Sequence, residues 1–467
     1  MAINQNQRFF LRIIIISLLL TVSIVFQGNS ETFIEKVNVL IKTHKRILAA
    51  KDTIKSVEEQ VSVARKSWFP ELSSTAFYGY EKRNLAPGNR NTRMPPHEVD
   101  LSITQPILDF GAKSSALEIA KLQLGQSKLV LDATLQGVLL EAISAQVGLI
   151  SAIEIERYAK RSVSNIKQQA KLEDARVSIG SGFSTDVLQA KAQLAGAEAR
   201  FTLSKGARSS SENRYRSVFG SLPEKNKKLE QLAIPVDRLP TSIDVAVSRS
   251  LKNNAQVRAL TVARDTTRAA IKQTRAAEFS PTVNLILDTK YKHNVTGTSG
   301  NAYEHLIKGE LKYTFNLGAT SFNNLAAVKA NYFASVNRLM DAQNLVEEQA
   351  RNAYEQLKIT QRNAQFLRNQ ANISGEFLRL ARKERRLGRR SLLDVLSGET
   401  VEINASSDAT NAENQVIVAA YSMLFVMGDL KVEDIKIDVY LVGPSKYVDL
   451  EKAILDGEDP MENKYVK

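Results

Sequence analysis

Residues 179–188 read IGSGFSTDVL, and residues 387–396 read LGRRSLLDVL. Both stretches place a glycine six residues before an Asp-Val-Leu triplet, and they lie 208 positions apart (394 − 186). A second landmark repeats in the same order, because Asp109-Phe110-Gly111 is answered by Asn316-Leu317-Gly318 at an offset of 207 (318 − 111). Landmarks that recur in one order at a nearly constant offset indicate a tandem duplication. The repeated unit is a helix, a strand hairpin and two further helices.

The duplication divides the chain. We expect a first repeat at 31–220 and a second at 241–430, with strand hairpins at 70–108 and 281–316 and tip turns near residues 180 and 388. A linker at 221–240 and a tail at 431–467 are less regular, and we assign both to an equatorial region. The two repeats are expected to share one body.

The N-terminus has the pattern of a secretory signal peptide at 1–30. Arg8 and Arg12 precede an apolar run from Ile13 to Phe26, and small residues follow it before Glu31. The run is shorter than the roughly 20 residues of a spanning helix, which favours a cleaved signal over a membrane anchor. We expect no later segment to cross a bilayer as a helix.

Composition excludes several classes of protein. The 467 residues include no cysteine, so the chain has no disulfides and no thiolate metal site. The net charge of +13, or +11 without Arg8 and Arg12, would suit nucleic-acid binding. The cations are interleaved with acids along helices of an exported chain, so we interpret them as solvated helix faces and expect no nucleic-acid partner.

Each predicted hairpin contains two segments, one on each side of its turn, in which apolar and polar residues alternate with the period of a β-strand. In the first repeat Val99, Leu101 and Ile103 alternate with Asp100 and Ser102. The second repeat does the same, with the apolar set Val283, Leu285, Leu287, Tyr291, Ile307, Leu311, Tyr313 and Phe315. An apolar face opposite a charged face is what a transmembrane barrel strand requires. A half-buried sheet of a soluble protein would give the same alternation.

The helices have apolar seams at spacings of four and three, which is the repeat of a coiled coil. The first seam is Leu124, Lys128, Leu131, Leu135, Val138, Ala142, Ala145, Leu149 and Ala152, and the second is Val346, Ala350, Ala353, Leu357, Thr360, Ala364, Leu367 and Ala371. A helix from about 112 to 174 would be on the order of 95 Å long. Seams with this much alanine favour a ring of closely approaching helices around a solvent space.

Four strands cannot close a barrel alone. An open sheet in a membrane would leave backbone groups unpaired at a cost of several kcal/mol each. Several copies of the chain are therefore expected to pool their strands.

The sequence contains little that would indicate an enzyme. The four histidines, at 44, 97, 293 and 305, have no ligand-spaced partner, and Gly180-Ser181-Gly182 lacks the third glycine of a dinucleotide loop. We expect no catalytic residues, no metal and no cofactor.

The two glycine turns are the candidate functional elements. Gly180 and Gly388 suit the ends of helices, Ser184 (or Thr185) and Ser391 suit the starts of the next helices, and Asp186 and Asp394 follow in the first turns. These acids can simply stabilise helix starts. Arg385, Arg386, Arg389 and Arg390 gather more densely at the second turn than capping needs, which indicates salt bridges between hairpins or a docking surface.

The order and duplication of these features resemble the TolC-like outer-membrane channel family from about residue 32 to 430. The motifs are the Pro-terminated strand entry, the strand exit Gln105-Pro106-Ile107-Leu108-Asp109-Phe110-Gly111 and the Gly-x5-Asp-Val-Leu helical turn. The resemblance implies a mainly α fold with a β-barrel part, in which a trimer forms a twelve-stranded barrel in the bacterial outer membrane and a helical tunnel in the periplasm. It also implies docking to a periplasmic adaptor and an inner-membrane transporter.

The resemblance also assigns roles at the tips. Asp394 matches the position of a constricting aspartate ring, Arg390 resembles an arginine that links protomers in the closed state, and Asp186 matches its acidic partner. Arg389 lies beside them, and Gly180, Gly388, Ser184 and Ser391 mark the adaptor-docking turns. Ser397 stands where a second acid can occur, so one carboxylate ring is expected instead of two.

The resemblance therefore implies a passive, tip-gated duct for drug efflux or type I protein secretion. The alternative is a coiled-coil envelope protein such as an adhesin or a periplasmic adaptor. An adaptor needs one helical hairpin between split β-domain halves, whereas this chain has two hairpins.

Overall fold

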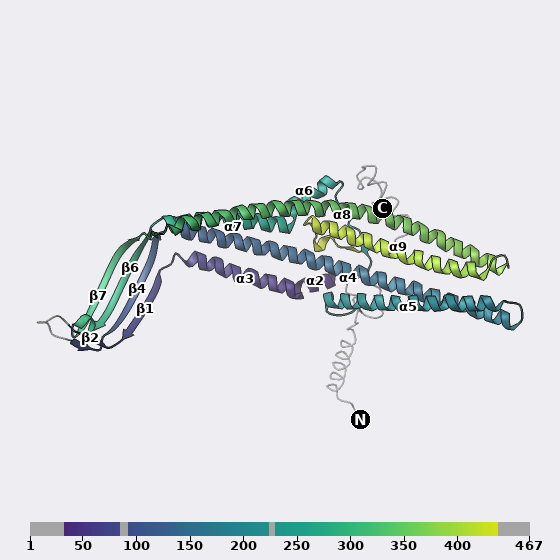
Figure 1. The fold of residues 1–467 in the computed structure, drawn as a ribbon, viewed down its shortest axis with the longest axis horizontal. Coiled ribbons are helices and arrows are strands. Elements are labelled where there is room, and N and C mark those ends of the chain that lie inside the picture. Colours follow the sequence, from purple (N-terminus) through teal and green to yellow (C-terminus); the bar gives the residue numbers. More distant parts are fainter. Residues whose placement is uncertain (1–31, 85–91, 224–228, 438–467) are drawn as a thin grey trace, which may run out of the picture.

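A computed structural model describes residues 32–84, 92–223 and 229–437. The described chain is a long rod with a β-sheet at one end and two helical hairpins running to the other (Figure 1). The predicted signal peptide and most of the C-terminal tail lie outside the described residues.

The sheet has four antiparallel strands in the order β1-β4-β6-β7. The strands are β1 (Glu71–Tyr78), β4 (His97–Leu108), β6 (Thr282–His293) and β7 (Asn301–Lys312). Between β1 and β4 the chain forms a second, smaller hairpin, β2 (Glu81–Arg83) with β3 (Thr92–Met94). Strands β1 and β7 form the two edges, and neither has a second neighbour among the described residues.

The strand register confirms the predicted alternation as far as Lys312, where β7 ends, whereas Tyr313 and Phe315 of the predicted apolar set lie beyond the strand. Leu72, Ile103, Leu287 and Ile307 are paired in one row across all four strands. A row three residues along, on the opposite face, holds Thr75, Asp100, Lys290 and Glu304. Residues that pair across strands lie on the same face, so apolar and charged side chains separate onto opposite faces.

Each repeat contains one very long helix, as predicted. Helices α4 (Ala112–Ser178) and α8 (Thr320–Arg386) have 67 residues each, which corresponds to about 100 Å. The returning helices are α5 (Ser184–Phe219) and α9 (Leu392–Val426). Within the described chain α4 packs against α5, α8 packs against α9, and the two hairpins meet through α4 and α9.

The sequence predicts one helix at the start of the first repeat, but the structure has two helices there, so that prediction was wrong. Helix α2 (Phe33–Thr43) ends at His44, whose backbone is extended, and α3 (Lys45–Lys66) begins after it. The second repeat breaks in the same way at Asn254, between α6 (Ile243–Asn253) and α7 (Ala255–Phe279). The break at His44 allows α2 to place Phe33, Val37 and Leu40 in the core.

Burial supports most of the predicted seams. In α4 the seam residues from Val138 to Ala152 are buried. Nearer the sheet the burial of the seam is incomplete, because Lys128 is exposed there. In α8 every predicted position is buried or half-buried between Val346 and Ala371.

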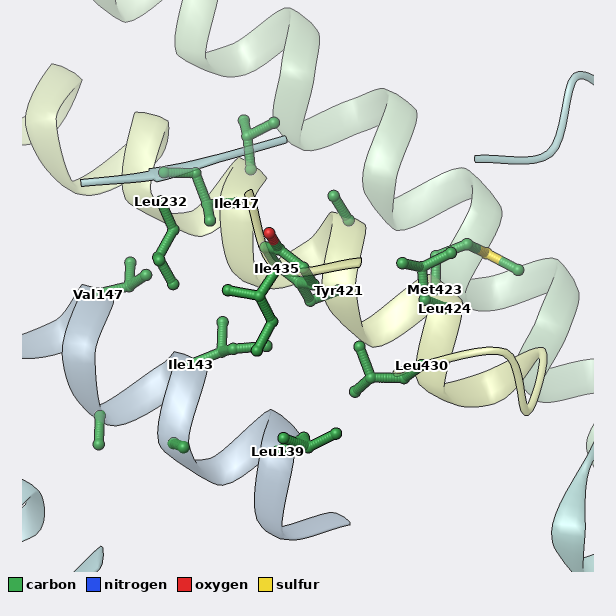
Figure 2. Packing of buried hydrophobic residues seen from close by; sticks show 14 of the residues in the cluster. Leu139, Ile143, Val147, Leu232, Ile417, Tyr421, Met423, Leu424, Leu430 and Ile435 are labelled. Atoms are coloured by element: carbon green, nitrogen blue, oxygen red, sulfur yellow. The ribbon is translucent and has the colours of Figure 1, made fainter. Parts of the chain in front are cut away.

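The main core lies at the middle of the rod, where both repeats meet (Figure 2). Leu139, Ile143 and Val147 of α4 face Tyr421 and Leu424 of α9. Short strands close the core, because β5 (Leu232–Ala233) of the predicted linker pairs with β8 (Lys436–Ile437) of the predicted tail, next to the 3-10 turns η1 (Val236–Arg238) and η3 (Val432–Asp434).

This core accounts for one departure from expectation. Helix α4 contains an apolar stretch that by length and composition alone could cross a membrane. Half of that stretch is buried inside the protein. We infer that this stretch is apolar because it packs against the core of the protein.

Candidate gate at the hairpin ends

The first hairpin turns at Gly180, as predicted. Its φ of +76° lies in the left-handed region, which glycine adopts without the strain of a side chain. Two backbone hydrogen bonds close the helix end, from Gly180 N to Val177 O (3.0 Å) and from Ser181 N to Arg176 O (2.9 Å). This pair of bonds is the Schellman arrangement that terminates a helix.

The expected cap at Ser184 or Thr185 is wrong. Helix α5 begins at Ser184, its N-cap is Phe183, and no side chain caps it. Because the helix starts earlier than the sequence suggested, Ser184 is already inside the first turn. Asp186 does lie in that turn, as predicted, where a negative charge is favoured by the helix dipole.

The second hairpin turns at Gly388, whose φ is +74°. The hydrogen bond from Arg389 N to Glu384 O (2.9 Å) closes the end of α8. Ser391 is the N-cap of α9, and its hydroxyl accepts a hydrogen bond from the backbone N–H of Asp394 at 3.1 Å. The predicted turn and cap are both present here.

Arg390 and Asp394 lie together beside this turn. The Arg390 Nε donates to Glu384 Oε2 at 2.6 Å, and its Nη1 lies 3.9 Å from Asp394 Oδ2. The guanidinium also lies over the ring of Phe377, 5.3 Å from its centre. Glu384 and Phe377 therefore hold Arg390 in place, and sequence reasoning named neither. The link from Arg390 to Asp186 of a neighbouring hairpin stays a prediction.

Buried carboxylates join the two hairpins just before their ends. Arg385 Nη2 of α8 lies 2.8 Å from Glu173 Oε1 of α4, which also pairs with Arg176. Asn165 of α4 donates to Glu399 of α9 at 3.3 Å. These contacts connect the repeats within one chain, so the ends of the hairpins are held together by polar contacts as well as by packing.

Sequence reasoning missed these carboxylates, although a signal was present. Glu173 continues a seam of Ile166, Ala170 and Val177 at spacings of four, three and four, and Glu173 is buried there. An acid in a seam position must find a partner, because burying an unpaired charge is costly. That rule identifies Glu173 as paired but does not name Arg385.

The arrangement favours a mechanical and electrostatic role. Across the described residues, no three histidine, cysteine or acidic side chains gather closely enough to hold a metal ion. The hairpin ends instead combine fixed turns, ion pairs and the exposed Arg389.

Comparison with known proteins places these features in a family context. The sequence model of the family described as "Outer membrane efflux protein" matches residues 37–221 and 246–429, one stretch in each repeat. The outer membrane efflux protein BepC of Brucella suis is 22% identical over 424 residues, covering 89% of this chain and 90% of BepC. The outer membrane protein TolC of Escherichia coli is 21% identical and covers 81% of this chain and 78% of TolC.

Solved structures agree in fold. The outer-membrane channel CmeC of Campylobacter jejuni superposes with a TM-score of 0.73 at 15% identity, covering 90% of each chain. The outer-membrane channel OprN has a TM-score of 0.73 at 19% identity and covers 86% of this chain and 91% of its own. The fold is therefore that of the TolC-like α/β barrel channels.

Proposed function

This chain belongs to the outer membrane efflux protein family, and from that membership we propose that it works as a trimeric export duct. In this proposal three copies form a passage through the outer membrane and the periplasm for small molecules or polypeptides. Transport through it is passive and is gated at the hairpin ends. The observation that supports it most is a two-faced sheet, with two edge strands that have no second neighbour among the described residues, at one end of helices about 100 Å long.

The two faces of the sheet suit lipid on one side and water on the other. Leu101 and Ile103 lie on the apolar face. On the other face the Lys290 Nζ lies 2.9 Å from Asp100 Oδ2, and the Lys292 Nζ lies 2.6 Å from Glu304 Oε2. Paired charges of this kind suit a water-filled lumen.

The open edges explain why several copies are needed. Edge strands β1 and β7 carry backbone donors and acceptors that a bilayer cannot satisfy. Three copies would supply twelve strands and join each β7 to the β1 of the next copy. A barrel larger than about eight strands leaves room for a passage inside.

The hairpin ends are the proposed gate. Three copies would place three Asp394 carboxylates around one axis, and Arg390 would hold neighbouring hairpins together in the closed state. Surface-like ion pairs contribute about 0–1 kcal/mol each, so docking of a partner is sufficient to break them. The partners in this proposal are a periplasmic adaptor and an inner-membrane transporter of an efflux or type I secretion system.

Conductance across a planar bilayer tests the proposal. The purified protein should open discrete ion-conducting steps, and Arg390→Ala should raise the conductance by loosening the closed end. Arg379→Ala is the matched control. Arg379 pairs with Glu376 on an exposed face of the same helix, outside the turn. Protein that inserts into the bilayer without conducting, in both the wild type and Arg390→Ala, would contradict the duct.

A further inference from the structure

The two hairpin ends, alike in backbone, differ in charge. Residues 171–191 hold three cations and three anions, whereas the matching residues 379–399 hold seven cations and three anions. The first end is thus neutral and the second carries +4. The offset of 208 makes these windows equivalent, so the difference was introduced on one copy of a duplicated element.

Internal ion pairs use only part of this positive charge. Arg379 pairs with Glu376, Arg382 with Glu399, Arg385 with Glu173, and Arg390 with Glu384. The remaining three cations are Lys383, Arg386 and Arg389, which we call the basic patch. All three are exposed, and none makes an ion pair within the part of the chain that the structure describes.

Helix-end electrostatics explains the basic patch only in part. Cations in the last turn of a helix are stabilised by its dipole, and Lys383 and Arg386 occupy that turn of α8. Arg389 lies beyond the helix, and the last turn of α4 holds a single cation, Arg176. Unpaired like charges repel one another, and an anionic partner would relieve that repulsion.

Large apolar side chains are exposed at both hairpin ends. Leu387, which follows Arg386 of the basic patch in sequence, is 63% exposed, and at the first hairpin end Ile179 is 78% and Phe183 is 75% exposed. Arginine and large apolar side chains together are typical of protein interfaces. A lipid headgroup would need only the charge. The observations therefore favour a protein segment with an acidic and an apolar face.

The patch is also in the right place for such a partner. It lies at the end of the rod farthest from the sheet, next to a turn whose backbone is fixed by hydrogen bonds (Figure 1). We propose that the basic patch is the docking surface for a segment of the periplasmic partner that has an acidic and an apolar face. This inference rests on the proposed function and assigns the charge of the partner that docks there.

A binding experiment with the full-length protein in detergent tests the patch. The probe is a fluorescent amphipathic peptide of about 20 residues, long enough to form a helix, with leucines on one face and glutamates on the other. A second peptide replaces each glutamate by lysine. The acidic peptide should bind at about 0.15 M salt, and K383Q/R386Q should weaken it about tenfold.

Two further variants make the result specific. K171Q/K191Q removes the same charge from the first hairpin and should change binding less than about twofold. K383E/R386E should lose the acidic peptide and gain the lysine peptide. Equal weakening by K171Q/K191Q would overturn the proposal, because the peptide would then be responding to the net charge of the whole protein.

Anionic vesicles of phosphatidylglycerol distinguish a lipid partner. Vesicle binding that depends on Lys383 and Arg386, without binding of the acidic peptide, would overturn the proposal in favour of a membrane surface. Planar-bilayer conductance of the same preparations separates the two proposals. Conductance without discrimination between the peptides would contradict the basic patch alone, whereas discrimination without conductance would contradict the duct and leave the patch as a docking surface.

Discussion

Arg385 of α8 and Glu173 of α4 form an ion pair of 2.8 Å across the two helical hairpins of one chain. The Glu173 side chain is 4% exposed, and its other partner, Arg176, belongs to the same helix. Arg385 is therefore the residue through which this buried carboxylate joins the hairpins.

Replacing Arg385 by alanine should loosen the hairpin ends. Removing one partner of a buried pair leaves the other charge poorly compensated, and because Arg176 remains, we expect a cost of roughly 1–3 kcal/mol. Hydrogen exchange of amides near Gly180 and Gly388 measures this loss. The control Arg379→Ala breaks an exposed pair and should change exchange little. Unchanged exchange in Arg385→Ala would show that apolar packing alone holds the ends together.

Replacing Asp394 by alanine should change ion selectivity. Three carboxylates around one axis attract cations, so the variant should show a lower preference for cations and weaker block by multivalent cations in planar bilayers. Asp174→Ala is a suitable control, because Asp174 is also exposed near a hairpin end and lies 3.5 Å from Lys191. If selectivity stays the same in the Asp394 variant, that residue only stabilises the start of α9.

Replacing Leu101 by arginine should destabilise the barrel. Leu101 lies on the apolar face of β4, and an arginine facing lipid near the membrane midplane costs roughly 2–4 kcal/mol. Asp100→Asn, one residue away on the charged face, should be mild. Reversible unfolding in lipid measures both variants. Labelling of position 100, but not of position 101, by a lipid-phase probe would contradict this assignment of faces.

The periplasmic body should lose stability in mild acid through His44. Burial and the nearby Arg46 lower the pKa of His44 below its ordinary value of 6.5, while Glu141 of α4 opposes them. A lowered pKa disfavours the charged form in the folded protein. The stabilisation is therefore complete above about pH 6.5 and is lost as the pH falls through the pKa of the folded state.

His44→Gln tests this prediction by thermal unfolding between about pH 7.5 and 5.5. The variant should lose part of the pH dependence of the wild type. Glu141 acts at lower pH, because the hydrogen bond from Arg46 lowers its pKa below 4.5. Identical pH profiles for the wild type and His44→Gln would remove His44 from this account.

Periodic features of the fold could be predicted from the sequence, and unique contacts could not. The alternation of Leu101 with Asp100 predicted the faces of the sheet because side chains in a strand alternate with a period of two. The seam from Val346 to Ala371 followed from the spacing of four and three. The break at His44 was missed, because no glycine or proline marks it and apolar residues continue on both sides.

The hairpin ends show the same limit. Gly180 and Gly388 identified the turns because few other residues adopt a positive φ easily. The cap at Ser184 was wrong because the first helical residue depends on local backbone geometry that a pattern leaves open by a residue or two. The pairing of Arg385 with Glu173 joins residues 212 positions apart, and no local rule selects that partner.

The mass of the purified protein in detergent, measured together with its strand content, tests the central claim most directly. The two open edges of the sheet predict an assembly of three copies with its strands intact, because only shared strands close the barrel. A stable monomer that keeps its full strand content would contradict the account, since its edge strands would then need no neighbouring copy.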